Sequence, residues 1–266
     1  MRKNARQCIA IFSVLLCSSL LVSSCGSGTT PEERVREQLA KQAEPGDTAE
    51  GVVQHAESDQ EAGASEKNSA DEVYESPVDF ASLQKQNADI CAWLYIPDTD
   101  ISYPVLQHET DDTFYLDHDS LRNESVSGSL FLDSYNTASF DDPVMVVYGH
   151  HMKSGAYFGE LQSYYDTEES FTEHSLIELY LPEEEREYEV FAAVPYDSIH
   201  LLYTYDFSDV AQFYVFFDRV YELRAFQACT VKEKYPAYGE KILILSTCLE
   251  GDNNRRFLVM AKEVTK

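Results

Sequence analysis

The sequence predicts a mainly β domain over residues 77–266, folded as a closed or nearly closed barrel. Three observations support this prediction. Short β-rich runs recur along these residues, with turn residues between most of them, which is typical of all-β barrels. One amphipathic helical stretch precedes the runs, and a second helical stretch interrupts them.

The leading helix is predicted over Ala81–Ile90, where Asp79 can act as the N-cap. The inserted helix is predicted within Asp206–Arg224, where apolar and aromatic side chains recur at helical spacing between the sixth and seventh strands. The predicted strands, in chain order, are Ala92–Tyr95, Ser102–Leu106, Gly128–Leu132, Val144–Tyr148, Ser175–Leu181, Glu187–Pro195, Phe226–Lys232, Lys241–Thr247 and Arg256–Val264.

The first 76 residues read as two segments that precede the folded domain. Residues 1–25 open with basic side chains and continue with an apolar run over Ile9–Val22, which is typical of a secretory signal and short for a membrane span. Residues 26–76 hold thirteen acidic and four basic side chains and almost no large apolar ones. Such a composition cannot bury enough surface to offset chain entropy, so we expect a disordered acidic tether.

Cys25 follows small residues in a stretch that resembles the lipobox, the site where bacterial lipoproteins are cleaved and acylated. The alternative is that Cys25 is incidental within an uncleaved anchor. In either case we expect the N-terminus to hold the protein at the extracellular face of the cytoplasmic membrane.

The charge distribution indicates which partners are compatible with the folded domain. The whole chain carries a formal net charge of −27, of which −21 falls on residues 77–266. So acidic a domain should repel nucleic acid and anionic wall polymers. The field would favour a cationic partner such as an amine nucleophile, although an acidic surface also serves solubility alone.

Three cysteines fall in the predicted folded domain, and an odd number leaves at least one thiol unpaired. Cys91 and Cys229 lie in apolar settings, where a cysteine is usually a small buried hydrophobe. Cys248 differs because it follows a strand and precedes a polar turn. It is therefore the candidate nucleophile.

The last two predicted strands flank a polar loop, Leu249–Arg255, that suits a hairpin. Antiparallel pairing would bring Cys248 beside Arg256, because opposed residues have Cβ atoms about 5 Å apart. Arg255 is the rival, one residue away and on the other face.

Acyl transfer by a thiol needs a thiolate nucleophile, an imidazole that exchanges protons and fixed donors for the oxyanion. His150 ends a predicted strand and could supply the imidazole, with Arg256 as the donor. Each of these residues alone also fits a structural role. A metal site has little support because His150 and His151 lack further spaced ligands, and no Gly-rich phosphate loop is present.

Residues 77–266 resemble a class B sortase, a cysteine transpeptidase of Gram-positive cell envelopes. The resemblance rests on several segments and on the leading and inserted helices. The segments are Trp93–Pro97, Ile101–Gln107, Phe114–Asp119, Gly128–Asp133 with Asn136, Tyr148–Met152 with Phe158, and Leu245–Cys248.

The resemblance implies an eight-stranded sortase barrel that needs no cofactor. Matched by motif, Cys248 would be the nucleophile, His150 the general acid and base, and Arg256 the oxyanion stabiliser, with His151 as the alternative to His150. Ser246 and Thr247 would line the acyl site and Leu116 would wall the groove for the sorting signal. Structural roles remain open for these last three, as a small strand residue, a buried β-branched residue and a core leucine.

The implied reaction cleaves a C-terminal sorting signal of secreted proteins after its threonine and holds the acyl group on Cys248 as a thioester. An amine of a peptidoglycan precursor or of a pilin-like subunit then releases it. Two alternatives remain: a cysteine peptidase in which water takes the place of the amine, and a non-catalytic envelope lipoprotein that binds peptide or wall fragments. The lipobox-like Cys25, the long tether and Leu249 after the nucleophile depart from the usual family pattern.

Overall fold

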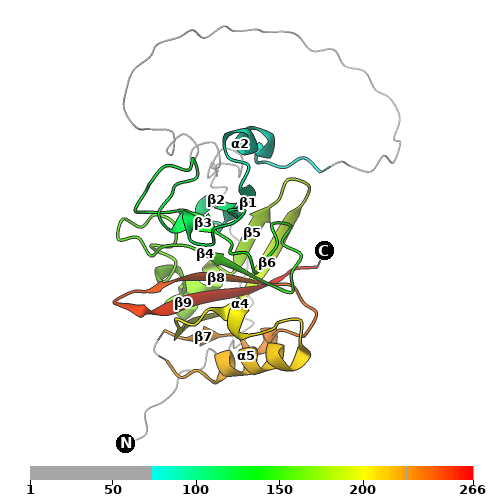
Figure 1. Cartoon of the computed structure of the whole chain (residues 1–266). Helices are drawn as coiled ribbons and strands as arrows, with labels where there is room; N and C mark the ends of the chain where they lie inside the picture. The colour runs from blue at the N-terminus through cyan, green and yellow to red at the C-terminus, as the bar shows by residue number, and fades with distance from the viewer. Residues whose placement is uncertain (1–73, 226, 266) are drawn as a thin grey trace, which may run out of the picture.

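The computed structural model describes residues 74–225 and 227–265 (Figure 1). The predicted signal segment, Cys25 and the tether up to residue 73 lie outside the described residues. No helix within the described part of the chain has the length and apolar character needed to cross a bilayer.

Eight strands close into a barrel, as the sequence and the family resemblance predict. Their order is β5-β1-β2-β3-β4-β8-β9-β6, and pairing of β6 with β5 closes the ring. A further short strand, β7 (Cys229–Thr230), pairs with β6. The barrel strands are β1 (Ile90–Tyr95), β2 (Ser102–Leu106), β3 (Leu130–Phe131), β4 (Val144–Tyr148), β5 (Leu176–Tyr180), β6 (Glu185–Asp197), β8 (Ile242–Leu249) and β9 (Asp252–Glu263).

Two of the strand pairs, β2–β3 and β4–β8, are parallel, while the others are antiparallel. In the β4–β8 pair, Val144 lies opposite Ile242 and Tyr148 opposite Ser246. Parallel strands that share a register leave the sheet at the same edge. The segment after Tyr148 and the end of β8 therefore lie side by side.

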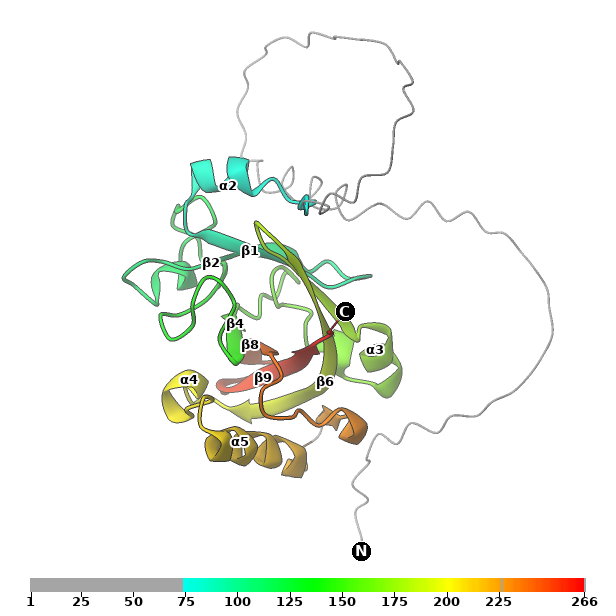
Figure 2. The same ribbon diagram turned by 90° about the vertical axis from the view of Figure 1, so that its right-hand side faces the viewer.

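The helices lie outside the ring of strands. Helices α4 (Leu201–Thr204) and α5 (Val210–Glu222) follow β6 and lie along the outside of the barrel near β6 and β9, whereas α2 (Phe80–Gln86) lies at the opposite end, beyond β1 (Figures 1 and 2). The remaining helical segments are α3 (Glu168–Glu173), η1 (Phe114–Leu116), η2 (Ser163–Tyr165) and η3 (Lys232–Lys234).

Several predicted boundaries differ from the observed ones for local reasons. The leading helix ends at Gln86, because Asn87 is extended and its side chain donates to the Tyr115 hydroxyl at 2.8 Å. The inserted helix begins at Val210, because the Asp209 carboxylate caps it by accepting from two backbone amides of the first turn. Two predicted strands, Gly128–Leu132 and Phe226–Lys232, are reduced to the two-residue strands β3 and β7. Helices α3 and α4 have no counterpart among the elements predicted from the sequence.

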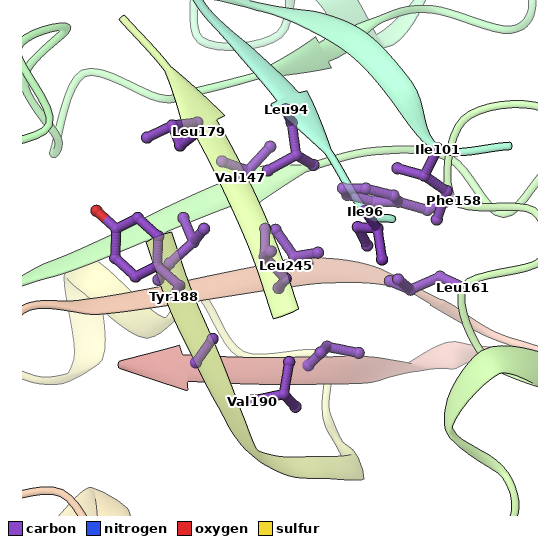
Figure 3. Packing of buried hydrophobic residues seen from close by; sticks show 14 of the residues in the cluster. Leu94, Ile96, Ile101, Val147, Phe158, Leu161, Leu179, Tyr188, Val190 and Leu245 are labelled. Atoms are coloured by element: carbon purple, nitrogen blue, oxygen red, sulfur yellow. The ribbon is translucent and has the colours of Figure 1, made fainter. Parts of the chain in front are cut away.

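Buried apolar side chains pack on both faces of the central strands. Figure 3 shows the cluster inside the barrel, where Leu94, Val147, Leu179, Val190 and Leu245 converge. A second cluster, on the outer face, packs β4, β6, β8 and β9 against the aromatic side chains of α5. Each fully buried large apolar side chain contributes about 1.5–3 kcal/mol. The strands that lead to Cys248 are thus held rigidly on both sides.

Candidate active site

Cys248 and Arg256 lie opposite each other near the turn that joins β8 to β9. The turn is shorter than predicted, because β8 continues to Leu249 and β9 begins at Asp252. A bulge at Cys248 and Leu249 shifts the register there. The guanidinium Nη1 of Arg256 lies 3.6 Å from the Cys248 sulfur. A fixed positive group therefore lies beside the half-buried thiol.

Arg255 lies on the other face of β9, where it pairs in register with Asp197 of β6. The guanidinium of Arg256 is held in place by its own turn, since Nη1 also donates to the carbonyls of Asn253 at 3.2 Å and of Arg255 at 3.3 Å. Of the two arginines, Arg256 is the one whose side chain reaches the thiol.

His150 comes to the same edge of the barrel by the parallel pairing of β4 and β8. The amide of Gly149 donates to the Ser246 carbonyl at 3.1 Å, which continues the ladder beyond Tyr148. His150 and Cys248 each lie two residues beyond the opposed pair Tyr148 and Ser246, on the same face. Because neighbouring strands are about 4.8 Å apart, the imidazole and the thiol leave the sheet as neighbours.

Gly149 is required at this position because the chain passes very close to the core. A Cβ atom on Gly149 would lie 2.4 Å from Leu130 Cδ2 and 2.6 Å from Phe158 Cδ2. Any side chain there would push the following histidine away from β8. The Tyr-Gly-His order thus has a packing reason as well as a chemical one.

The imidazole of His150 is oriented by a backbone carbonyl. Its Nε2 lies 2.7 Å from the carbonyl oxygen of Leu116, in the turn η1. A carbonyl can only accept a hydrogen bond, so Nε2 carries the proton and Nδ1 of the neutral ring has the free lone pair. This tautomer leaves Nδ1 as the atom that can take a proton.

Comparison with known proteins assigns this arrangement to a family. A family model described as the sortase domain matches residues 94–264. Sortase B of Listeria monocytogenes is 31% identical over 195 residues, which cover 71% of this chain and 75% of that protein. The chain belongs to the sortase family.

Solved structures place this sortase in class B, as the sequence motifs indicate. A Staphylococcus aureus sortase B–substrate complex superposes with a TM-score of 0.61 at 27% identity, covering 70% of this chain and 84% of that one. A class B sortase of Streptococcus pyogenes involved in pilus biogenesis gives a TM-score of 0.59 at 25% identity, covering 70% and 98%. The protein is therefore an enzyme of the cysteine transpeptidase type.

The adjacent His151 has a different environment in this sortase. It forms an isolated antiparallel bridge with Tyr157. Its Nδ1 is buried and has no hydrogen-bond partner among the described residues.

The three residues predicted to contact substrate lie in different places. The Leu116 side chain is 42% exposed, next to the carbonyl that holds His150. Ser246 is buried, and it lies on the same face of β8 as Cys248 because it comes two residues earlier in the strand. Thr247 points to the interior face, opposite Phe257, and its buried Oγ1 has no hydrogen-bond partner in the described structure. Ser246 is thus on the side of the thiol, Leu116 is next to His150, and Thr247 faces the barrel interior.

The other thiols of the described domain are unsuited to nucleophilic chemistry. Burial raises the pKa of Cys91 to about 12, and its sulfur lies 3.3 Å from the Val105 carbonyl. Cys229 is buried in the barrel-interior cluster. Within the described residues, no cluster of three or more His, Cys, Asp or Glu side chains could hold a metal ion.

Three supporting contacts of the site were not predicted from the sequence. The carbonyl of Leu116 holds His150, the buried side chain of Gln162 accepts from the Glu250 amide at 3.1 Å in the hairpin turn, and Asp133 lies buried beside Tyr148. Two of these contacts use backbone atoms, which residue identity does not reveal. The only one of these contacts with a signal in the sequence is that of Asp133, an acidic residue directly after the third predicted strand.

Proposed function

We propose that this sortase cleaves the C-terminal sorting signal of secreted proteins after a threonine and transfers the acyl part to an amine. The observation that supports it most strongly is the guanidinium of Arg256 at 3.6 Å from the Cys248 sulfur, at the barrel edge that His150 also reaches. Nucleophile, base and oxyanion donor then share one edge of a rigid sheet.

In the first half of the proposed reaction the Cys248 thiolate attacks the threonine carbonyl carbon, and the carbonyl oxygen becomes an oxyanion that Arg256 stabilises. The peptide C–N bond then breaks as protonated His150 donates to the leaving nitrogen. The acyl group remains on sulfur as a thioester.

In the second half an amine attacks the thioester carbonyl. Neutral His150 takes the proton that the amine loses, through the lone pair that the Leu116 contact leaves on Nδ1. The C–S bond breaks and the thiolate is regenerated. The chemistry is complete with these three side chains, so we propose no cofactor.

We propose an amine of a peptidoglycan precursor or of a pilin-like subunit as the acceptor. The net charge of −21 on residues 77–266 favours a cationic amine near the domain. One of the named relatives is described as involved in pilus biogenesis, which fits a pilin-like acceptor.

We further propose that the protein acts at the outer face of the cytoplasmic membrane and is held there by its N-terminus. The support is the signal-like run before Cys25 and the lipobox-like setting of that cysteine. Mass spectrometry of the protein purified from its native membrane would find a diacylglycerol mass on Cys25, whereas a protein that begins at Met1 would favour an uncleaved anchor.

The experiment that tests the activity is intact-mass spectrometry of the full-length protein in mild detergent. The protein is incubated with a pool of Pro-x-Thr peptides, with and without triglycine or diaminopimelate. We expect a peptide-fragment adduct that is missing in Cys248→Ala and that the amine discharges into a ligated product. A matched control, Cys91→Ala, should keep the adduct.

Other outcomes would favour the alternatives. Discharge of the adduct to the free acid in the presence of amine would indicate a hydrolytic peptidase. Absence of any adduct, together with no reaction of Cys248 with a vinyl sulfone thiol probe, would contradict transpeptidation and favour a binding role.

A further inference from the structure

The segment that leads from β6 to α5 makes a polar contact with the barrel in addition to its apolar packing. His200 lies in this segment and Asp133 follows β3. The Nε2 atom of His200 is 3.0 Å from Oδ2 of Asp133, whose side chain is only 4% exposed, whereas the His200 side chain is 42% exposed. The exposed part of this segment thus meets a buried carboxylate through one imidazole.

The second nitrogen of His200 is also occupied. Its Nδ1 accepts from the Tyr203 amide at 3.1 Å and so caps the short helix α4. Because Nδ1 must keep its lone pair to accept, the proton of the neutral ring is on Nε2, which faces Asp133. One imidazole therefore contacts the barrel through Nε2 and the first turn of α4 through Nδ1.

Asp133 needs such a partner because it is buried. Burial raises the pKa of Asp133, and the nearby carboxylate of Asp112 acts in the same direction. The His200 imidazole and the amide of Tyr135, which donates to Oδ1, oppose that rise, which means that they favour the carboxylate. A buried carboxylate that lost these partners would be left poorly solvated.

This contact lies next to the proposed catalytic groups. Tyr148 directly precedes Gly149 and His150, pairs in register with Ser246, and has its ring centroid 6.3 Å from that of His200. The Tyr148 hydroxyl is buried, and its titration is influenced by both Asp133 and Arg256. Tyr148 therefore lies between the contact and the Cys248 edge of the barrel.

The same imidazole also orders two exposed aromatic side chains. The ring of His200 is 5.0 Å from Tyr135 and 6.5 Å from Tyr203, and these two tyrosines meet edge to face at 6.2 Å. Their exposed fractions are 51% and 76%. The buried side chains of Leu201 and Tyr205 hold the rest of the segment against the outer cluster. His200 is therefore the contact that orders the exposed part of the segment, with this aromatic pair, beside Tyr148.

We propose that His200 is a positioning residue for peptide binding: through its contact with Asp133 it fixes the exposed residues 200–203, together with Tyr135, as a wall next to Tyr148 at the barrel edge that carries Cys248. The inference rests on the proposed transpeptidase function and adds to it a residue that touches no reacting atom. Replacing His200 should therefore change the affinity for the peptide but not the reactivity of the Cys248 thiol.

The test compares two substitutions of His200. His200→Phe keeps a ring between the tyrosines and removes both nitrogens, while His200→Gln keeps a donor and an acceptor. The substrate is the Pro-x-Thr peptide that gives the strongest Cys248 adduct with the wild-type protein. For His200→Phe we expect KM to rise about tenfold with kcat within about twofold, as for a loss of ground-state binding. His200→Gln should recover most of the affinity.

Three measurements separate positioning from a general structural effect. Vinyl sulfone labelling of Cys248 should keep its wild-type rate in His200→Phe, while hydrogen exchange at the Tyr203 amide should become faster. Asp133→Asn should add less than about twofold to KM in the His200→Phe background, because both changes break one contact. His174→Phe is the matched control, since His174 is half-buried and contacts Tyr164 and Ser170 instead.

Several results would overturn the proposal. An unchanged KM in His200→Phe, with a faster-exchanging Tyr203 amide, would mean that the segment can move without affecting the peptide. Slower labelling of Cys248 would mean that His200 acts on the nucleophile. Equal KM values in the Phe and Gln variants would exclude the two ring nitrogens as the cause. Failure of the proposed function is distinct, because the wild-type protein would then form no peptide adduct.

Discussion

The two ends of the parallel strand pair β4–β8 differ in what surrounds them. At their beginnings, Val144–Val147 and Ile242–Leu245 are buried on both faces, by the barrel interior and by the cluster under α5. At their far ends, His150 and Cys248 are only half-buried and the side chains become polar. The buried first halves of the two strands, the packed halves, therefore hold the strands in place. Their half-buried far ends, the open ends, can carry reactive side chains because the stability of the fold does not depend on them.

The largest effect should come from the histidine at the open end. We expect His150→Ala to lower kcat/KM about 10²- to 10⁴-fold, because it removes the proposed proton carrier. His151→Ala is the matched control, since it is the adjacent histidine and lacks the Leu116 carbonyl contact that orients His150. Peptide cleavage rates of the two variants check this, and a greater loss with His151→Ala would reverse the assignment.

Arg256 should come next. Replacement by Met removes the guanidinium next to the thiol, and we expect kcat to fall about 10²- to 10³-fold, as for the loss of an oxyanion donor. Arg255→Met should have a small effect because Arg255 lies on the other face of β9, opposite Asp197. Single-turnover acylation of Cys248 measures both, and similar rates in the two variants would argue against the assigned role.

Substitutions in the packed halves should lower the free energy of unfolding. Leu245 is fully buried in the barrel interior, so Leu245→Ala should lower the free energy of unfolding by about 2–5 kcal/mol. Cys248→Ala, three positions further along β8, should change it by less than about 1 kcal/mol because the side chain is small and half-buried. Urea unfolding of the two variants tests the contrast, which would fail if their losses were equal.

A smaller effect on activity is expected at Gly128, which supports the carbonyl that holds His150. Gly128 has φ +56°, and a Cβ there would lie 2.5 Å from the Tyr115 oxygen and 2.7 Å from the Leu116 oxygen. Gly128→Ala should displace the Leu116 carbonyl and lower kcat/KM about tenfold, since misplaced catalytic groups are costly.

Gly239→Ala is the control for Gly128→Ala. Gly239 also has a positive φ, of +98°, but no atom lies within 4 Å of the position of its Cβ. Both variants therefore carry backbone strain, and only one pushes on the carbonyl. If the two lost the same activity, the contact between Leu116 and His150 would not be the cause.

The smallest effect should be a pH dependence of stability from Asp133. Because burial raises its pKa in the folded protein, the folded state keeps this proton to a higher pH than the unfolded state. Between the two pKa values the folded state binds more protons, so stability from this group falls as pH rises through that window. Unfolding free energies of wild type minus those of Asp133→Asn should decrease over that range, and a flat difference would contradict the prediction.

Long-range features of the fold followed well from the sequence, while local boundaries did not. The barrel, the inserted helix and the opposition of Cys248 and Arg256 were predictable, because β-rich runs separated by turn residues indicate a barrel and the polar loop between the last two strands indicates a hairpin. The end of α2 and the shortness of β3 were not, since a tertiary contact of Asn87 with Tyr115 and a single pairing between Phe131 and Tyr148 decide them.

The sequence by itself determined the family, the barrel and the candidate residues Cys248, His150 and Arg256, because residue types and their spacing along the chain contain that information. Only the tertiary structure decided that the Leu116 carbonyl orients His150 and that His200 meets Asp133. These contacts join segments far apart in the chain through a backbone atom and a buried carboxylate. Their partners are set by the parallel register of β4 with β8 and by the packing of the segment after β6, neither of which leaves a periodic signal in the sequence.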